Sequence, residues 1–327
     1  MLSRTADHLF WMARYIERAE NTARMLDVNM QMSLLPKVEM GGEEGWRAML
    51  GISELQQAYD VRHARVTPKS VLDFMVRDPS NPSSIYSCLQ ASRNNARAVR
   101  GVVTTEFWET HNATWLELHN LLSGKTLERD PSELFEWVKF RSHLSRGVMI
   151  GTMLKDEAFH FARLGTFLER ADNTARILDV KYHGLARRGR LVEPASDSQT
   201  QSSEANGHGD FYHWAAVLRS VSAFEIYRKV YRDVITPARV AELLILRRDM
   251  PRSLAACVDE VGLNLNKVSN SQSRETERRA GMLSAELQFG SIDHILQTGL
   301  HAYLTNFLER VNDIGSRISR DFLVWHN

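Results

Sequence analysis

The residues best placed to do chemistry in this 327-residue chain belong to a polar motif that occurs twice. Residues 15–28, YIERAENTARMLDV, return as FLERADNTARILDV at 167–180, and setting 8–28 against 160–180 gives 11 identities in 21 positions. Core packing tolerates many apolar exchanges, so packing alone rarely preserves the polar residues of a helix. Here the polar residues are better matched between the two copies than the apolar ones, which predicts a duplicated unit with a specific polar role.

Each copy of the motif places a polar stripe beside the apolar face of a helix. In the first copy, Glu17 shares its face with Asn21 and Arg24, which follow it at i+4 and i+7. Glu17 and Arg18 are adjacent and point about 100° apart, so they cannot pair with each other. If the motif is functional, its partners come from other helices. The candidate residues of the two copies are Glu17, Arg18, Asn21, Arg24, Glu169, Arg170, Asn173 and Arg176.

Two interpretations of these stripes stay open. In the structural one, Glu–Arg and Asn contacts between helices fix the register of the motif helices, a common use of buried polar residues. In the functional one, the stripes converge on a polar cleft that binds a ligand or the end of a partner's chain. Guanidinium groups suit such a cleft because they fork onto carboxylate or phosphate oxygens. The arginines concerned are Arg18, Arg24, Arg170 and Arg176.

A third, weaker copy of the motif stands in FLERVNDIGSR, with Glu309 and Arg310 as its Glu-Arg pair. This copy lacks the Asn-Thr-Ala-Arg that follows the pair in the other two copies. We include Glu309 and Arg310 among the candidates for the same cleft or register network.

Other arrangements of reactive residues are weaker. Glu157 and His160 have the Glu-x-x-His spacing of di-iron bundles, but the position equivalent to Glu157 is Thr5, so no metal site is expected. Cys88 and Cys257 fall in matching amphipathic segments and are expected to be buried rather than nucleophilic. The sequence has no glycine-rich phosphate loop, no Gly-x-Ser-x-Gly and no zinc-type Cys/His pairing, so we expect no cofactor.

The composition indicates a globular, bacterial-type protein of the cytoplasm. Charged residues make up 25% and hydrophobic residues 43%, and 41 basic against 40 acidic side chains give a net charge of +1. This balance removes any global electrostatic argument for nucleic acid or an anionic membrane as a partner. No apolar run approaches the roughly 18–20 residues of a membrane-spanning helix. The first residues do not resemble a signal peptide, and two cysteines suit a reducing compartment.

Helices are expected to position the candidate side chains, because glycine (18) and proline (8) are sparse and no segment alternates with period two. Apolar residues around the first motif repeat at 3-4 spacing, as in a helix packed lengthwise against others. They are Leu9, Met12, Ile16, Ala19, Ala23, Leu26 and Met30. Further helical patterns cover 46–62, 68–77, 83–110, 113–122, 131–155, 211–233, 237–247, 252–264, 270–289 and 291–323.

We therefore predict an all-α fold, a multi-helix bundle built from an internal duplication with a third motif helix at its end. A second landmark supports the duplication, since aligning two prolines 169 positions apart, Pro82 and Pro251, also aligns the pairs Ser84/Ser253 and Cys88/Cys257. A single domain is expected over 1–327, with pseudo-repeats at about 1–155 and 156–290, a C-terminal helix at about 291–323 and a flexible loop at 187–210, rich in Ser, Gln, Gly and Asn.

The sequence resembles the alpha-E family, bacterial helical proteins defined by a Glu-Arg motif. The likeness covers essentially the whole chain and includes SRTADHLFWMARYIERAENTARMLDV, PSSIYSCLQASRNNAR from Pro82 and LRSVSAFE at Leu218–Glu225. The resemblance maps the family's pair onto Glu17/Arg18 and Glu169/Arg170, whereas Glu309/Arg310 departs from the pattern. It implies a domain of unknown function, encoded or fused beside an atypical ATP-grasp ligase and a transglutaminase-like protein.

Two hypotheses about function follow. The first is a non-catalytic accessory or scaffold protein that serves this ligase or transglutaminase system in the synthesis or modification of peptide or amide bonds. Its expected partners are the ATP-grasp ligase or transglutaminase-like protein and a peptide or small anionic ligand, not nucleic acid or membrane. The alternative is an enzyme of acyl or amide transfer, with Glu17 or Glu169 as acid or base in a Glu-Arg polar cleft. Arginines usually lower a neighbouring carboxylate's pKa, which favours the accessory hypothesis.

Overall fold

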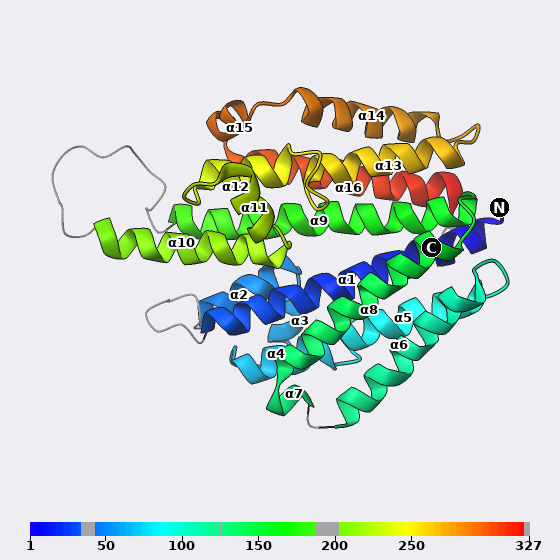
Figure 1. Ribbon diagram of the computed structural model, residues 1–327, viewed down its shortest axis with the longest axis horizontal. Coiled ribbons are helices and arrows are strands. Elements are labelled where there is room, and N and C mark those ends of the chain that lie inside the picture. The colour runs from blue at the N-terminus through cyan, green and yellow to red at the C-terminus, as the bar shows by residue number, and fades with distance from the viewer. Residues whose placement is uncertain (34–42, 125, 188–202, 324–327) are drawn as a thin grey trace.

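The protein is built from α-helices (Figure 1). The computed structural model describes residues 1–33, 43–124, 126–187 and 203–323. Sixteen helices and no strand are present in these ranges, so the predicted all-α class is confirmed. Across the same ranges, no helix is both long and apolar enough to cross a membrane.

The helices form two series, each beginning with a helix of 31 residues. The first series is α1 (Ser3–Ser33), α2 (Glu43–Ile52), α3 (Gln56–Asp60), α4 (Pro68–Val76), α5 (Ile85–Ala98), α6 (Thr105–Ser123), α7 (Thr126–Arg129) and α8 (Pro131–Thr152). The second is α9 (Glu157–Arg187), α10 (Ser203–Ser220), α11 (Phe224–Tyr231), α12 (Pro237–Ile245), α13 (Leu254–Val268), α14 (Arg274–Phe289), α15 (Ile292–Thr298) and α16 (Leu300–Phe322). The two long helices, α1 and α9, carry the two copies of the motif.

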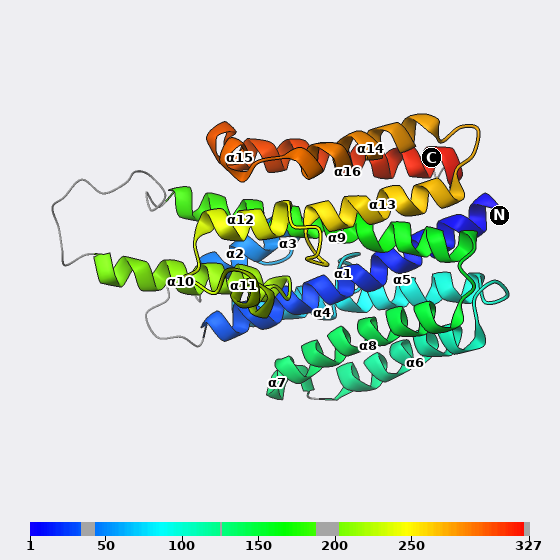
Figure 2. The ribbon, with the colours of Figure 1, turned by 45° about the horizontal axis from the view of Figure 1, so that its top comes forward.

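α1 and α9 lie side by side in the middle of the molecule and run in the same direction (Figure 1). α5 and α8 pack on α1 with α6 outside them, whereas α13 and α16 pack on α9 with α14 outside them. Figure 2 shows these two groups on opposite sides of the α1–α9 pair. The apolar face predicted for α1 is confirmed, because its residues are buried, although Met30 is buried only in part. This face, called the seam below, consists of Leu9, Met12, Ile16, Ala19, Ala23, Leu26 and Met30.

The two long helices approach each other closely at Gly165. A Cβ atom added there would lie 2.1 Å from the backbone oxygen of Phe10 on α1. That separation is far inside van der Waals contact, so only a residue without a side chain fits between the helices. The crossing therefore brings the two backbones together directly and places the polar residues that follow it within reach of each other.

Local contacts recur at matching positions of the two series. Serine caps the fifth helix in each, Ser84 before α5 and Ser253 before α13. A histidine of each long helix also meets an asparagine of the helix packed on it, with Nδ1–Oδ1 distances of 2.7 Å for His8–Asn95 and 2.8 Å for His160–Asn264. These matches agree with the predicted internal duplication, which stays a prediction, as does the division into pseudo-repeats.

One correction concerns the predicted helices 83–110 and 113–122. The first pattern ends at Ala98 in α5, and α6 begins after Thr104 and runs through the second. Thr104 starts the new helix because its hydroxyl accepts a hydrogen bond from the backbone N–H of Phe107. Apolar periodicity continued across the break, so the pattern did not reveal it.

Positive φ angles interrupt three further predicted helices. The pattern at 46–62 breaks at Glu54, that at 211–233 at Ser222 and that at 291–323 at Gly299, with φ of 56°, 55° and 100°. A residue in this region of backbone space cannot continue a right-handed helix, so the chain turns there and starts a new one.

The predicted flexible loop at 187–210 is partly corrected. Its residues 188–202 lie outside the described residues. α9 extends to Arg187 and α10 already begins at Ser203, before the predicted start at 211. Helix formation is cooperative, so turns extend from the packed part of α10 into a segment of weak intrinsic propensity.

Replacing Gly165 tests the close approach of the long helices. Gly165→Ala is expected to lower the free energy of unfolding by about 2 kcal/mol or more, because the helices must separate. The matched control is Gly147→Ala, at an exposed site in α8 with open space around the new Cβ. It is expected to raise stability by up to about 1 kcal/mol. Urea unfolding measures both, and equal effects of the two substitutions would contradict the predicted contact.

Candidate functional site

The Glu-Arg pairs of the motif form crossed ion pairs between α1 and α9. Arg18 donates from Nε to Oε1 of Glu169 at 2.6 Å and from Nη2 to Oε2 at 3.0 Å. Arg170 makes the same two contacts with Glu17, at 2.9 and 3.0 Å. Each arginine thus binds the glutamate of the other copy through two N–H groups, those of Nε and Nη2. The prediction that the partners of each pair come from another helix is confirmed.

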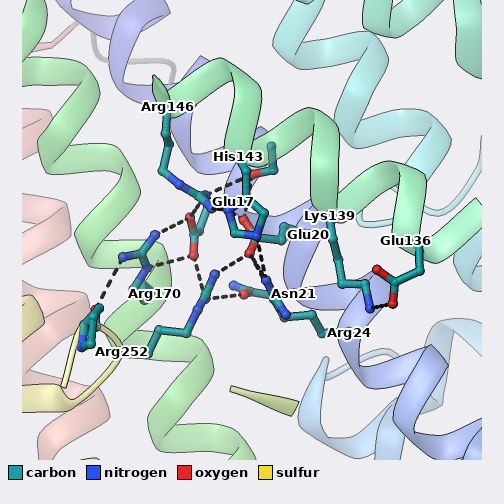
Figure 3. Close-up of polar contacts among 12 residues, drawn as sticks. Glu17, Glu20, Asn21, Arg24, Glu136, Lys139, His143, Arg146, Arg170 and Arg252 are labelled. Carbon is teal, nitrogen blue, oxygen red and sulfur yellow. Dashed lines mark hydrogen bonds and ion pairs between the residues drawn. The ribbon is translucent and has the colours of Figure 1, made fainter. Parts of the chain in front are cut away.

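Glu17 lies in a buried cluster that also draws on α8 and on the turn before α13 (Figure 3). Arg146 donates to its Oε2 at 2.9 Å and Arg252 to its Oε1 at 2.8 Å. Glu20 binds the same two arginines, at 2.6 Å from Arg146 and 2.5 Å from Arg252. Both carboxylates are 0% exposed. Buried charges of this kind are tolerated only when they are paired and hydrogen-bonded.

Neighbouring polar side chains complete the cluster. The hydroxyl of Ser142 donates to Glu20 at 2.7 Å, and Arg24 donates to Glu20 at 2.8 and 2.9 Å along the same helix. Arg252 also donates to Oδ1 of Asn21 at 3.0 Å. Four of the predicted residues, Glu17, Asn21, Arg24 and Arg170, therefore take part in a network that links four segments of the chain.

His143 of α8 stands between two arginines of this cluster. Its Nε2 lies 3.1 Å from Nη2 of Arg24, and its Nδ1 lies 2.7 Å from Nη2 of Arg146. Burial lowers the pKa of His143, against the opposing charge of Glu20, which favours the neutral ring. A neutral imidazole has one acceptor nitrogen, so it accepts a hydrogen bond from one of these arginines at a time.

The arginines keep the buried glutamates ionised. Burial by itself raises the pKa of Glu17, but the charges of its arginine partners, led by Arg170 and Arg252, lower it to about 2. The same balance, with arginine charge outweighing burial, lowers the pKa of Glu20 and of Glu169. These carboxylates are therefore fixed anions at neutral pH and not proton donors.

A polar pocket of about 240 Å³ lies beside the ion pair of Arg18 and Glu169. Arg14 donates to the same glutamate at 2.7 Å, and Asp172 accepts from Arg176 at 2.7 Å. The pocket reaches the surface near Glu54, whose side chain is 72% exposed and which pairs with Arg176. Five predicted candidates line it: Arg18, Asn21, Glu169, Asn173 and Arg176.

The structure thus divides the predicted residues between two places. Glu17, Arg24 and Arg170 belong to the buried cluster, and Asn21 contributes to both cluster and pocket. The register interpretation describes the cluster, whose ion pairs join helices in the interior. The cleft interpretation concerns the pocket, and ligand binding there stays a prediction.

The third pair, Glu309 and Arg310, is not part of either place, which corrects its inclusion among the candidates. Glu309 is exposed, and Arg310 pairs with Glu286 of α14. α16 buries its apolar seam, which includes Phe307 and Val311, against its neighbours. That rotation turns the Glu-Arg pair away from α1 and α9.

Three arginines of the site were not predicted from the sequence: Arg14, Arg146 and Arg252. Arg14 and Arg146 lie outside the repeated letters, and only the packing of α1, α8 and α9 brings them to the motif. Arg252 carried a usable signal, because Pro251-Arg252-Ser253 aligns with Pro82-Ser83-Ser84. The substitution of arginine for serine between otherwise matching residues marks a position where the two halves differ.

The remaining sequence candidates take part in other contacts. Cys88 and Cys257 are buried and free, and burial raises the pKa of each thiol to about 12. Glu157 binds the amino group of Met1 at 2.6 Å, while the ring of His160 faces an asparagine of α13. No group of three or more His, Cys, Asp or Glu side chains suited to a metal ion occurs within the described parts of the chain.

The fold and the site define an all-helical protein organised by a Glu-Arg motif at the interface of two long helices. This chain belongs to the Alpha-E family, described as a predicted alpha-helical domain with a conserved ER motif, which matches residues 1–323. The resemblance noted in the sequence is therefore confirmed.

Curated relatives of this chain come from mycobacteria. Uncharacterized proteins of Mycobacterium bovis and Mycobacterium tuberculosis are 23% identical to it over 337 residues. The match covers 94% of this chain but 35% of each relative, so the chain spans about a third of their length. No solved structure matches it.

Replacing Arg252 tests the buried cluster. Arg252→Met keeps a side chain of similar length but leaves Glu17 and Glu20 short of a cation, which is expected to cost about 3–5 kcal/mol. The matched control is Arg248→Met, because Arg248 is 44% exposed and pairs with Asp259 on the surface. Its loss is expected to cost at most about 1 kcal/mol. Thermal or urea unfolding distinguishes the two, and a small effect at Arg252 would contradict the network.

The pKa of Glu17 also predicts how stability depends on pH. Its folded-state pKa of about 2 is below the ordinary value of 4.5, so its stabilisation is complete above pH 4.5 and is lost as pH falls toward 2. The size of the loss is about 3 kcal/mol from this residue. Urea unfolding between pH 6 and pH 2.5 should show this fall, and it should be shallower in Glu17→Gln. An equally steep fall in that variant would assign the effect to other carboxylates.

Proposed function

We propose that this protein is a non-catalytic helical accessory or scaffold protein that works with an ATP-grasp ligase or transglutaminase-like protein in the synthesis or modification of peptide or amide bonds. One observation carries this proposal. The charged groups of the Glu-Arg motif are ionised and mutually paired, and they stand next to an open polar pocket. Such an arrangement suits recognition of a polar ligand, because fixed donors and acceptors need no proton exchange to bind it.

The groups that an acyl-transfer enzyme would use are poorly poised for that chemistry. A general acid or base works best with a pKa near the operating pH, whereas the pKa of Glu17 is about 2. A cysteine nucleophile needs a thiolate, whereas burial raises the pKa of Cys88 and Cys257 to about 12. These directions favour the accessory role over the enzyme alternative.

The proposed partner is supported by the relatives and by the family context. The matched region makes up about a third of each mycobacterial relative, so this fold occurs in one polypeptide with additional protein. The family's association with ATP-grasp and transglutaminase-like proteins, implied by the resemblance, gives that additional protein a chemical class. A cytoplasmic setting, suggested by two free buried cysteines, belongs to the same proposal.

Co-expression with the ATP-grasp ligase or transglutaminase-like protein of the same organism tests the partnership. Tagged protein is expected to retain the partner through affinity purification and size-exclusion chromatography. An ATP-grasp ligase of unrelated function, expressed at the same level, serves as the control and should not be retained.

Two results would overturn the proposal. One is the absence of a complex with either partner at micromolar concentrations of both proteins. The other is turnover of a peptide or amide substrate by the purified protein alone, since an accessory protein has no such activity.

A further inference from the structure

Two asparagines that line the polar pocket have a side-chain amide nitrogen without a hydrogen-bond partner among the described residues. Oδ1 of Asn21 accepts a hydrogen bond from Arg252, and because arginine can only donate, this contact fixes which end of the amide is oxygen. Nδ2 of Asn21 must then point the other way. It is buried and, within the described residues, has no hydrogen-bond partner, as is also true of Nδ2 of Asn173. Asn21 is 3% exposed, and both residues line the pocket.

A buried N–H group without a partner destabilises the folded protein, so a ligand with a hydrogen-bond acceptor would be favoured in this pocket. Leaving a buried donor unsatisfied costs about 1–3 kcal/mol. Arginine side chains add donors of the same kind at the same place. Arg18 uses Nε and Nη2, and Arg14 uses Nε, to hold Glu169, so both guanidinium groups have further N–H groups to offer. Two amides and two guanidinium groups therefore converge on one space.

The pocket exists because the two sides of the α1–α9 pair are filled differently. On the side of Glu17, the space is occupied by Arg252, Arg146 and His143. The residues 169 positions away from these three are small or neutral: Ser83 for Arg252, Asn312 for His143 and Gly315 for Arg146. Ser83 and Asn312 line the pocket, and Gly315 with Asn312 lines an adjoining hollow of about 290 Å³.

The size and charge of the pocket restrict the class of ligand that it can bind. Its 240 Å³ is smaller than the roughly 300–1,000 Å³ of pockets for drug-sized molecules, so the ligand is small or is the end of a chain. Three arginines and three carboxylates line it, so a large polyanion would meet as much repulsion as attraction. A single carboxylate satisfies the donors, and Asp172 and Glu54 are acceptors for an N–H group beside it.

We propose that this pocket binds the carboxylate of a small amide-containing ligand, such as the end of a peptide, between the amides of Asn21 and Asn173 and the guanidinium of Arg18. This inference deepens the proposed accessory function and rests on it, because it names the ligand class that the same site would present to its partner. The guanidinium donors are held in place before binding by their ion pairs with Glu169, which limits the entropy lost on binding.

Calorimetric or NMR titration of the purified protein with N-acetylglycine tests the ligand class. This probe has one carboxylate and one amide, and N-acetylglycinamide carries a neutral primary amide in place of the carboxylate. The carboxylate form is expected to bind at least about tenfold more tightly, since hydrogen bonds to charged groups are the stronger ones. Equal binding of the two probes, binding of ethylguanidinium instead, or no binding at all would each overturn the proposal.

Two variants locate the binding. Asn21→Asp keeps an oxygen for Arg252 but replaces the unpartnered donor by an acceptor, and should weaken N-acetylglycine binding at least about tenfold. The matched control is Asn29→Asp, because Asn29 is also buried on α1 with an unpartnered Nδ2 but lines a different pocket. Ser83→Arg introduces the side chain that fills the opposite side and should also abolish binding. Melting temperature and circular dichroism establish that each variant is folded.

The outcomes separate this inference from the proposed function. Loss of binding in Asn21→Asp and Ser83→Arg, but not in Asn29→Asp, supports the pocket. Unchanged binding in folded Ser83→Arg protein would overturn it. These titrations use the chain alone, so they do not depend on a partner protein. If N-acetylglycine binds but no ligase complex forms, the proposed partner is wrong and the proposed ligand class stands. If a complex forms but N-acetylglycine does not bind, the ligand class is wrong and the partner stands.

Discussion

The structure depends on the crossed ion pairs between the two long helices. Each arginine of the Glu-Arg motif grips the glutamate of the other copy, so neither helix can slide or rotate without breaking two bidentate contacts at once. The contact is also close, because Gly165 lets the backbones meet at the crossing that precedes the pairs. Every other large helix packs on α1, on α9 or on a helix that does, so the register of this pair is transmitted through the fold.

The same contact explains why so many charges are buried. A lone carboxylate in the interior would take up a proton or unfold the chain, and Glu17 and Glu20 avoid both outcomes by sharing Arg146 and Arg252. The arginines come from α8 and from the turn before α13, so the cluster also ties the outer helices to the central pair. Charge pairing here specifies geometry more than it adds stability, because desolvation offsets much of the attraction.

The two faces of the central pair are filled differently. On one face, arginines of the protein itself fill the space beside the motif, and the result is a closed network. On the other face, Ser83 and Asn312 leave a polar pocket between similar motif residues. One motif thus contributes to a closed network on one side and lines an open pocket on the other, and a few residues outside the motif make the difference.

Much of the fold could be predicted from sequence, because helices follow from local periodicity. The buried seam of α1 and the pairing of Glu20 with Arg24 depend only on residues within a few turns of each other. Helix breaks at Ser222 and Gly299 were missed because the apolar pattern continues across them. Glu309 was wrongly included in the site for a related reason. The sequence around it matches the motif, but the buried apolar face of α16 leaves Glu309 exposed.

The sequence by itself determined the helical class, the two copies of the motif and the fact that Glu17 and Arg18 cannot pair with each other. These follow from spacing along one helix, which is a short-range property. Only the tertiary structure decided that Arg18 meets Glu169, that Arg252 closes one face and that Nδ2 of Asn21, a residue lining the pocket, has no hydrogen-bond partner among the described residues. These depend on which helices pack together and at what rotation, and that is set by the burial of apolar surface over the whole chain.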